Sequence, residues 1–212
     1  FKLIKYNKNI KCIQITNSDI KNMLIKKGVE KNKIFKIPIS VDIKKFPFYR
    51  NDQKILLKKR KNLDKFLVIG SFQKDGVGWG DGNRPKLIKG PDVFVKIIKK
   101  LNKKIKVHVV LTGPSRGYVI NNLKKLNVSY EHHLVKNYSE LHKYYKLLDC
   151  YIVTSRHEGG PRSILESMAS GVPIYSTKVG QAKELIINGS NGWLYGNKNL
   201  NSLVDLIHYN FK

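Results

Sequence analysis

Two glutamates, Glu158 and Glu166, stand where residues able to do chemistry are densest in this 212-residue chain. They flank a Gly-Gly-Pro turn at 159–161, which directly follows an apolar run, Cys150–Thr154, that predicts a buried strand. Open α/β sheets bind ligands beyond the carboxyl ends of their strands, so both carboxylates would lie at such an edge. We expect them to face one ligand from different sides, with helix amides after the turn suiting a phosphate. The alternative is that the Glu158 carboxylate only interacts with the dipole at the helix N-terminus and that Glu166 lies on the ordinary surface of the helix.

Lys86 and Lys89 give a second chemical signal, because they stand just before Gly90-Pro91, where another helix is predicted to begin. A cation near a helix N-terminus is unfavourable alone, since the backbone dipole already presents positive charge there. An anion such as a phosphate would make the arrangement favourable. The alternative, in a chain this rich in lysine, is that both ammonium groups reach solvent.

A glycine-rich segment, Gln73–Lys86, separates the first predicted strand from its helix. It lacks the G-x-G-x-x-G spacing and no helix opens directly behind it, so we exclude a dinucleotide-binding fingerprint. Long loops in compact domains are typically functional or mobile. The segment is therefore either a flexible loop or a loop that closes over a ligand.

The elements that must position these residues alternate between short β-branched runs and helical patterns from about Phe66 onward. This alternation predicts an α/β fold with a doubly wound, Rossmann-like parallel sheet. Strands are expected at 66–71, 106–112, 128–131, 150–154, 173–176 and 192–195. Helices are expected at 91–101, 116–126, 138–148, 162–170, 181–188 and 200–209.

The first 60 or so residues do not share that rhythm. They hold a strand-like run at Ile13–Thr16, a helix at Ser18–Lys27 with Ser18 as its expected N-cap, and an extended stretch at Ile34–Pro47. We interpret them as the exit from another domain.

The formal net charge is +26, a value that raises nucleic acid or an anionic membrane as a partner. Only six of the 41 cations are arginine, however, and the lysines are scattered along the whole chain with isoleucine and asparagine. A compositional bias with no dedicated partner explains the charge equally well. The two cysteines, Cys12 and Cys150, suggest neither a disulfide framework nor a metal site, and no apolar run is long enough to span a bilayer.

The spacing of Glu158 and Glu166 resembles the E-x7-E arrangement of retaining glycosyltransferases with the GT-B fold. The segment that contains them, EGGPRSILESMASGVPIYSTKVGQAKELI, looks like the donor-site signature of glycosyltransferase group 1, the family 4 type. Further segments of the chain resemble other motifs of the family in the same order, so that the resemblance runs from about residue 13 to 209. These segments are IFKIPISVDIKKF, FLVIGSFQKDG, KLIKGPDVFVKII, LTGPSRG and INGSNGWLY.

The resemblance implies a role for each matching residue. Glu166 would hold the ribose hydroxyls of a nucleotide sugar, Lys89 would meet its diphosphate, and Glu158, as the catalytic residue, would hydrogen-bond the donor sugar. The donor would also be lined by Gly159, Gly160, Pro161, Arg162, Ser163, Lys86, Gly70 and Ser71. Two positions depart from the family pattern. Gly70-Ser71 replaces a Gly-Arg pair whose arginine contacts the diphosphate, so that Arg84, Lys74 or Lys86 would have to make this contact, or it is absent. Ser40 replaces a glycine.

The resemblance also implies a domain organisation, the C-terminal half of a GT-B fold. Residues 1–60 would be a remnant of the N-terminal domain with the interdomain linker, and residues 61–212 the donor-binding domain. The implied reaction transfers a hexosyl group from a nucleotide diphosphate sugar to a glycan, lipid-linked or protein acceptor, with retention and without a cofactor or metal, since no DxD motif occurs. We expect this fragment to bind the donor without turnover. The expected location is the cytoplasm, with peripheral association with the cytoplasmic membrane face as an alternative. We expect no specific binding of nucleic acid. The rival interpretations are a non-catalytic basic module that binds nucleic acid or anionic membrane and, more remotely, a GT-B-like epimerase.

Overall fold

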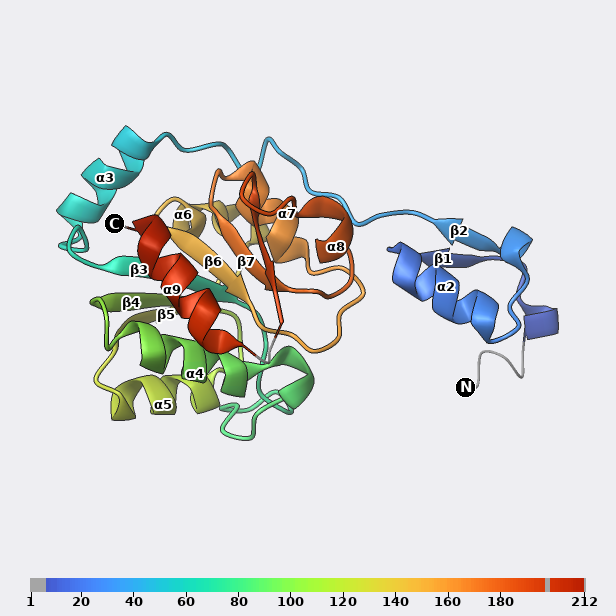
Figure 1. The fold of residues 1–212 in the computed structure, drawn as a ribbon, viewed down its shortest axis with the longest axis horizontal. Coiled ribbons are helices and arrows are strands. Elements are labelled where there is room, and N and C mark those ends of the chain that lie inside the picture. Colours follow the sequence, from blue (N-terminus) through green and yellow to red (C-terminus); the bar gives the residue numbers. More distant parts are fainter. Residues whose placement is uncertain (1–6, 197–198, 212) are drawn as a thin grey trace.

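A six-stranded parallel sheet forms the centre of the computed structural model, which describes residues 7–196 and 199–211 (Figure 1). The strands lie in the order β5-β4-β3-β6-β7-β8, so the order reverses between β3 and β6. This is the doubly wound, Rossmann-like α/β fold that the alternating pattern predicted. The strands are β3 (Leu67–Phe72), β4 (Val107–Thr112), β5 (Ser129–His133), β6 (Cys150–Val153), β7 (Ile174–Thr177) and β8 (Gly192–Tyr195).

Helices cover both faces of the sheet and bury one apolar cluster on each. One face carries α4 (Pro91–Leu101), α5 (Gly117–Lys125) and α9 (Leu200–Phe211). The other carries α6 (His142–Tyr145), α7 (Arg162–Ala169) and α8 (Ala182–Leu185). In α4, buried residues recur at helical spacing, so the amphipathic pattern fixes which side meets the sheet: Val93, Phe94, Ile97, Ile98 and Leu101.

Two predicted helices are wrong in their extent. The helix expected at 138–148 is a 3₁₀ turn, η4 (Tyr138–Glu140), followed by the single turn of α6, because the Asn137 side chain accepts the Ser139 N–H and starts a tight turn. The helix expected at 181–188 ends early, because the backbone at Ile186 is extended.

Helix α3 (Asn51–Arg60) was not predicted, because its sequence has no apolar stripe. Two buried lysines attach it to the main body. Lys54 Nζ donates to the Gly171 carbonyl at 2.7 Å, and Lys58 Nζ contacts Asp149 at 2.7 Å. The helix is therefore held by polar contacts between distant segments, and the predicted domain boundary at residue 60 stays a prediction.

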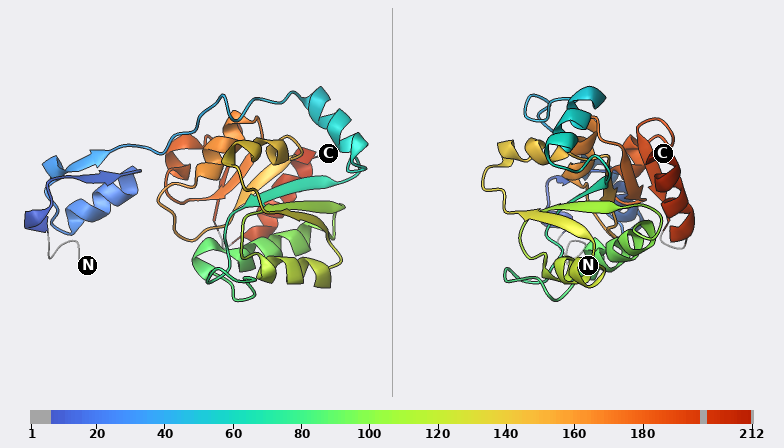
Figure 2. Two further views of the ribbon diagram at one scale, coloured as in Figure 1. Left: turned by 180° about the vertical axis from the view of Figure 1, so that it is seen from behind. Right: turned by 90° about the vertical axis from the view of Figure 1, so that its left-hand side faces the viewer.

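The N-terminal unit, residues 7–39, lies beside α8 at one end of the molecule (Figures 1 and 2). Its strands β1 (Ile13–Ile15) and β2 (Ile34–Lys36) pair in parallel, and helix α2 (Ser18–Lys26) packs on them. The predicted N-cap Ser18 is wrong, because Asn17 has the extended backbone of a cap and accepts the Ile20 N–H. Short 3₁₀ turns complete the described elements: η1 (Asn7–Asn9), η2 (Lys31–Lys33) and η3 (Leu87–Lys89). Within the part of the chain that the structure describes, no helix is long and apolar enough to cross a membrane.

Candidate functional site

A pocket of about 280 Å³ lies at the carboxyl ends of β3 and β6, where the strand order reverses. This is the position at which open α/β sheets bind their ligands. It brings together seven of the eleven residues predicted from the sequence: Lys89, Glu158, Gly160, Pro161, Arg162, Ser163 and Glu166. The other lining residues are mostly apolar or aromatic: Phe72, Gln73, Leu141, Tyr151, Ile152 and Val153.

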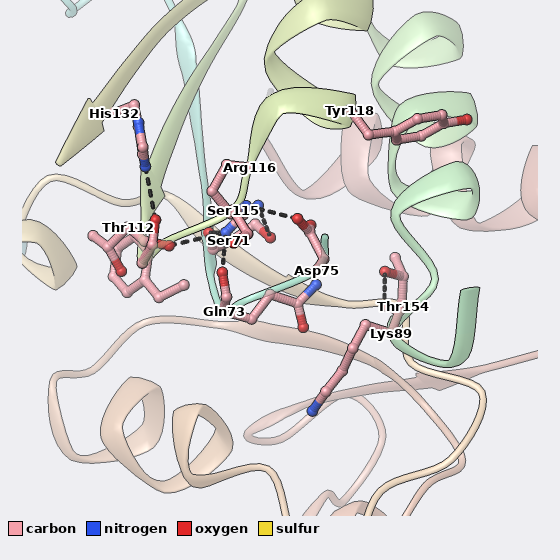
Figure 3. Close-up of polar contacts among 12 residues, drawn as sticks. Ser71, Gln73, Asp75, Lys89, Thr112, Ser115, Arg116, Tyr118, His132 and Thr154 are labelled. Carbon is pink, nitrogen blue, oxygen red and sulfur yellow. Dashed lines mark hydrogen bonds and ion pairs between the residues drawn. The ribbon is translucent and has the colours of Figure 1, made fainter. Parts of the chain in front are cut away.

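Glu158 and Lys89 form an ion pair in this pocket, with 2.5 Å between Oε1 and Nζ. The Ser155 hydroxyl donates to the same carboxylate oxygen at 2.9 Å. Lys89 reaches the pocket from η3, whose end is held against β6 because the Lys89 carbonyl accepts from the Thr154 hydroxyl (Figure 3). Gly90 allows this approach, since it has φ of 67° and a Cβ there would lie 2.0 Å from the Thr154 carbonyl oxygen. The pocket thus holds a cation and a carboxylate side by side, a donor and an acceptor for a polar ligand.

Glu166 lies in α7 with both carboxylate oxygens bound by tyrosine hydroxyls. Tyr138 donates to Oε1 at 2.6 Å and Tyr145 to Oε2 at 2.8 Å. Burial raises the pKa of Glu166 above its ordinary value, although the two phenol hydrogen bonds oppose that shift. Tyr145 is fully buried, whereas Tyr138 is partly exposed and lies under the Arg162 guanidinium. Sequence reasoning missed both tyrosines, because nothing in their spacing shows that they turn toward Glu166.

Four of the predicted residues do not line the pocket. Gly70 lies in β3 against Leu148 and Tyr151, where an added Cβ would clash. Lys86 is exposed, and the Gly159 carbonyl faces the N-terminal unit. The Ser71 hydroxyl is buried and accepts a hydrogen bond from Arg116.

The proposed substitutes for the missing family arginine do not line the pocket either. Lys74 Nζ lies 3.4 Å from the centre of the Trp79 ring, and Arg84 is exposed. Lys89 and Arg162 are the two cationic side chains among the lining residues. A diphosphate in this pocket would therefore meet these two cations first.

A buried arginine, Arg116, holds the segment that follows β3, as Figure 3 shows. Its Nε lies 3.0 Å from the Asp75 carboxylate, and both side chains are almost wholly buried. Burial raises the pKa of Asp75 and lowers that of Arg116. The guanidinium also donates to the backbone carbonyls of Ser71, Gln73 and Thr112. The network fixes Gln73 at the pocket wall, and its members are too far apart in sequence to have been linked beforehand.

The glycine-rich loop packs on the N-terminal end of α5, and none of residues 74–86 lines the pocket. Ser115 Oγ donates to the Gly80 carbonyl at 2.9 Å, and the Gly117 N–H donates to the Asp81 carbonyl at 2.8 Å. Gly82 has φ of 78°, and a Cβ there would lie 2.2 Å from the Ser115 carbonyl oxygen. Glycine is therefore required where the loop backbone touches that of Ser115.

The family model of the glycosyl transferases group 1 matches residues 83–211, which include Lys89, Glu158 and Glu166. This chain belongs to that family. Membership in a glycosyltransferase family favours a transferase over a basic module for nucleic acid or membrane.

Curated relatives of this glycosyltransferase are similar over part of their length. An uncharacterized glycosyltransferase of Methanocaldococcus jannaschii is 31% identical over 122 residues, which cover 56% of this chain and 34% of the relative. The lipopolysaccharide core biosynthesis mannosyltransferase LpsB of Rhizobium meliloti is 34% identical over 73 residues, which cover 34% of this chain and 21% of LpsB. The matched segments thus span about a third or less of these relatives.

Solved glycosyltransferase structures share the fold over nearly the whole chain. Anabaena HepE, in complex with UDP and glucose, superposes with a TM-score of 0.77 at 18% identity, covering 98% of this chain and 55% of HepE. Sucrose-phosphate synthase from Thermosynechococcus elongatus superposes with a TM-score of 0.74 at 20% identity, covering 98% of this chain and 51% of that structure. The likeness agrees with the predicted C-terminal, Rossmann-like half of a GT-B fold.

Proposed function

We propose that this group 1 glycosyltransferase binds a nucleotide diphosphate sugar in the pocket at the ends of β3 and β6. The observation that carries the proposal is that Lys89, before α4, lines one pocket together with Glu158 and Glu166, which lie in the distant segment from β6 to α7. Structural neighbours such as HepE hold UDP and glucose, which supports a nucleotide sugar as the donor class.

Each side chain has a role that its surroundings suit. Lys89 and Arg162 address the diphosphate, because they bring positive charge to the pocket. Glu166 accepts from ribose hydroxyls, and Glu158 accepts from a hydroxyl of the donor sugar. Accepting a sugar hydroxyl would leave the Glu158 contact with Lys89 in place, since a carboxylate has lone pairs for both.

The proposed reaction transfers the hexosyl group to an acceptor with retention of its anomeric configuration. Retention rests on the resemblance of Glu158 and Glu166 to the E-x7-E arrangement. The two cations would stabilise the charge that develops on the leaving diphosphate, so we propose that no metal is needed. The acceptor belongs to the glycan, lipid-linked or protein class.

Calorimetry with Lys89→Ala and Lys86→Ala tests the donor site. UDP, GDP and ADP are titrated alongside their nucleosides and their glucose or mannose conjugates. Lys89→Ala should weaken binding of the diphosphate about tenfold, as loss of a hydrogen bond to a charged group implies, and leave nucleoside binding nearly unchanged. Lys86→Ala removes an equal charge outside the pocket and should change neither. Equal losses for nucleoside and diphosphate, or no binding of any of these ligands by the wild type, would contradict the proposal.

A further inference from the structure

A side chain of the N-terminal unit reaches the loop that carries Glu158. Asn17 is only 1% exposed, and its Nδ2 donates to the Gly159 carbonyl at 2.5 Å and to Thr16 Oγ1 at 3.1 Å. Its Oδ1 accepts the Ile20 N–H at 3.0 Å and so caps α2. The amide orientation is fixed, because a backbone carbonyl requires the donor and a backbone N–H requires the acceptor.

The Gly159 carbonyl receives a second hydrogen bond from the same unit, since Thr16 Oγ1 donates to it at 2.5 Å. The opposite side of the peptide is also occupied. A Cβ on Gly180 would lie 2.7 Å from the Gly159 oxygen, so that glycine permits the close approach. The Gly159–Gly160 peptide, next to Glu158, is therefore held between the N-terminal unit and the segment just before α8.

The neighbouring Gly160 is enclosed in the same way. A Cβ on Gly160 would lie 2.4 Å from Gln181 Oε1 and 2.8 Å from Ile39 Cδ1. Gln181 is itself buried, and its Oε1 accepts the Ile39 N–H at 3.1 Å. Residues of the N-terminal unit thus contact both glycines between Glu158 and α7.

We propose that Asn17 is a positioning residue for the donor sugar. By holding the Gly159 carbonyl it fixes the Gly159–Gly160 peptide, and thereby restricts the backbone next to Glu158 and the direction in which the Glu158 carboxylate faces Lys89. The inference rests on the proposed function, in which Glu158 contacts the sugar, and it extends the donor site to a residue outside the matched family segment, 83–211.

The contacts of Asn17 indicate which ligand should lose affinity when Asn17 is substituted. The Asn17 side chain hydrogen-bonds neither Glu166 nor Lys89, which we assign to the nucleotide and the diphosphate. Loss of its donor frees the Gly159–Gly160 peptide next to Glu158 and thereby changes the sugar contact. Affinity for the nucleotide sugar should therefore fall more than affinity for the nucleoside diphosphate alone.

The substitution Asn17→Asp separates positioning from folding. Aspartate keeps the size of the side chain and is as good an N-cap as asparagine, so α2 should be retained. It replaces the amide donor with a carboxylate oxygen against the Gly159 carbonyl. Affinity for UDP-glucose or GDP-mannose, whichever the wild type binds, should fall about fivefold or more, and affinity for UDP or GDP should change less than about twofold.

Two further variants provide a second test and a control. Thr16→Val removes the other donor to Gly159 with little change of shape, and it should shift the same ratio in the same direction even if Asn17→Asp proves unstable. Glu184→Gln perturbs the contacts that Ser18 and Lys36 of the same unit make with α8, away from the Glu158 loop, and should leave the ratio unchanged.

The outcomes distinguish this inference from the proposed function. If the wild type binds none of these ligands, the proposed function fails and the inference fails with it. If the wild type binds both members of a pair and folded Asn17→Asp or Thr16→Val loses affinity for both equally, or for neither, the inference alone is overturned. A shift of the ratio in Glu184→Gln would also overturn it, because the ratio would then report general loosening of the N-terminal unit.

Discussion

Glu166 is a buried carboxylate whose two oxygens are already bound by phenols. Tyr145 packs edge-on against Phe72 in the core, so its hydrogen bond to Oε2 is held in place. Tyr138 is partly exposed, so its hydrogen bond to Oε1 is the one that a ligand hydroxyl can replace. Tyr145 therefore orients the carboxylate, and we propose Oε1 as the oxygen that a ribose hydroxyl contacts.

Glu166→Gln should lower nucleotide affinity about tenfold or more, which corresponds to about 1.4 kcal/mol, because the amide keeps the shape but loses the charge and one acceptor oxygen. The fold should be retained, since the amide can still hydrogen-bond both phenols. Calorimetry on the nucleotide and on its 2′,3′-dideoxy analogue measures the effect. The analogue should bind the wild type poorly and respond little to the substitution. A variant that binds nucleotide as the wild type does would contradict the assignment of Glu166.

The raised pKa of Glu166 implies that the free energy of unfolding of the chain depends on pH. Burial raises the pKa of Glu166 in the folded chain above its unfolded value, so between the two values the folded chain binds more protons. Its contribution to the free energy of unfolding is therefore largest below the unfolded pKa and falls as pH rises through the folded pKa. Urea unfolding at several pH values should show Glu166→Gln gaining stability relative to the wild type as pH rises from about 4 to 7. A relative loss over that range would contradict the prediction.

At the scale of elements, the site depends on segments that begin at strand ends. The segment after β3 is fixed by Arg116 from the start of α5, and η3 after the glycine-rich loop is fixed against β6 by Thr154. Gln73, at the first end of that loop, and Lys89, in η3 just beyond its other end, both line the pocket. The loop therefore matters to the site through its anchored ends, while its tip lies on α5.

Arg116→Met should destabilise the chain by about 3–5 kcal/mol, because it leaves the Asp75 carboxylate buried without its counter-charge. Urea unfolding measures the loss, and hydrogen exchange should show faster opening of residues 73–86. The matched control is Lys104→Met, which breaks an ion pair with Asp205 whose side chains are 44% and 60% exposed. That pair should contribute about 0–1 kcal/mol. Similar losses in the two variants would show that the Arg116 network does not anchor the loop.

At the scale of the whole molecule, the described residues form the pocket at one sheet edge that we propose binds the donor. The chain matches 55% of HepE and about half of sucrose-phosphate synthase, whose remaining parts have no counterpart in the superposition. Transfer requires donor and acceptor to be held together in one orientation. We propose that the acceptor contacts come from protein beyond these 212 residues.

The purified 212-residue chain should accordingly bind donor but show no hexosyl transfer. The measurement is release of nucleoside diphosphate in the presence of glycan, lipid-linked and peptide acceptors, with donor binding followed in parallel by calorimetry. Robust turnover that Glu158→Gln abolishes would show instead that the acceptor site lies within the chain.

The sequence by itself determined the α/β class, the order of the main strands and helices, and the strand-turn-helix that carries Glu158 and Glu166. These features are local, because the period of apolar residues and the Gly-Pro punctuation act over a few neighbouring positions. Such local signals also located Lys89, just before the start of α4.

Only the tertiary structure decided the contacts that make these residues a site. Lys89 meets Glu158 across 69 positions of sequence, Tyr138 meets Glu166 across 28, and Asn17 meets Gly159 across 142. Helix α3 could not be predicted from the sequence for the same reason, because its buried lysines bind partners 91 and 117 positions away. Hydrogen bonds and ion pairs between distant segments leave no periodic signal in a sequence, because the partners become neighbours only when the sheet and its helices have packed.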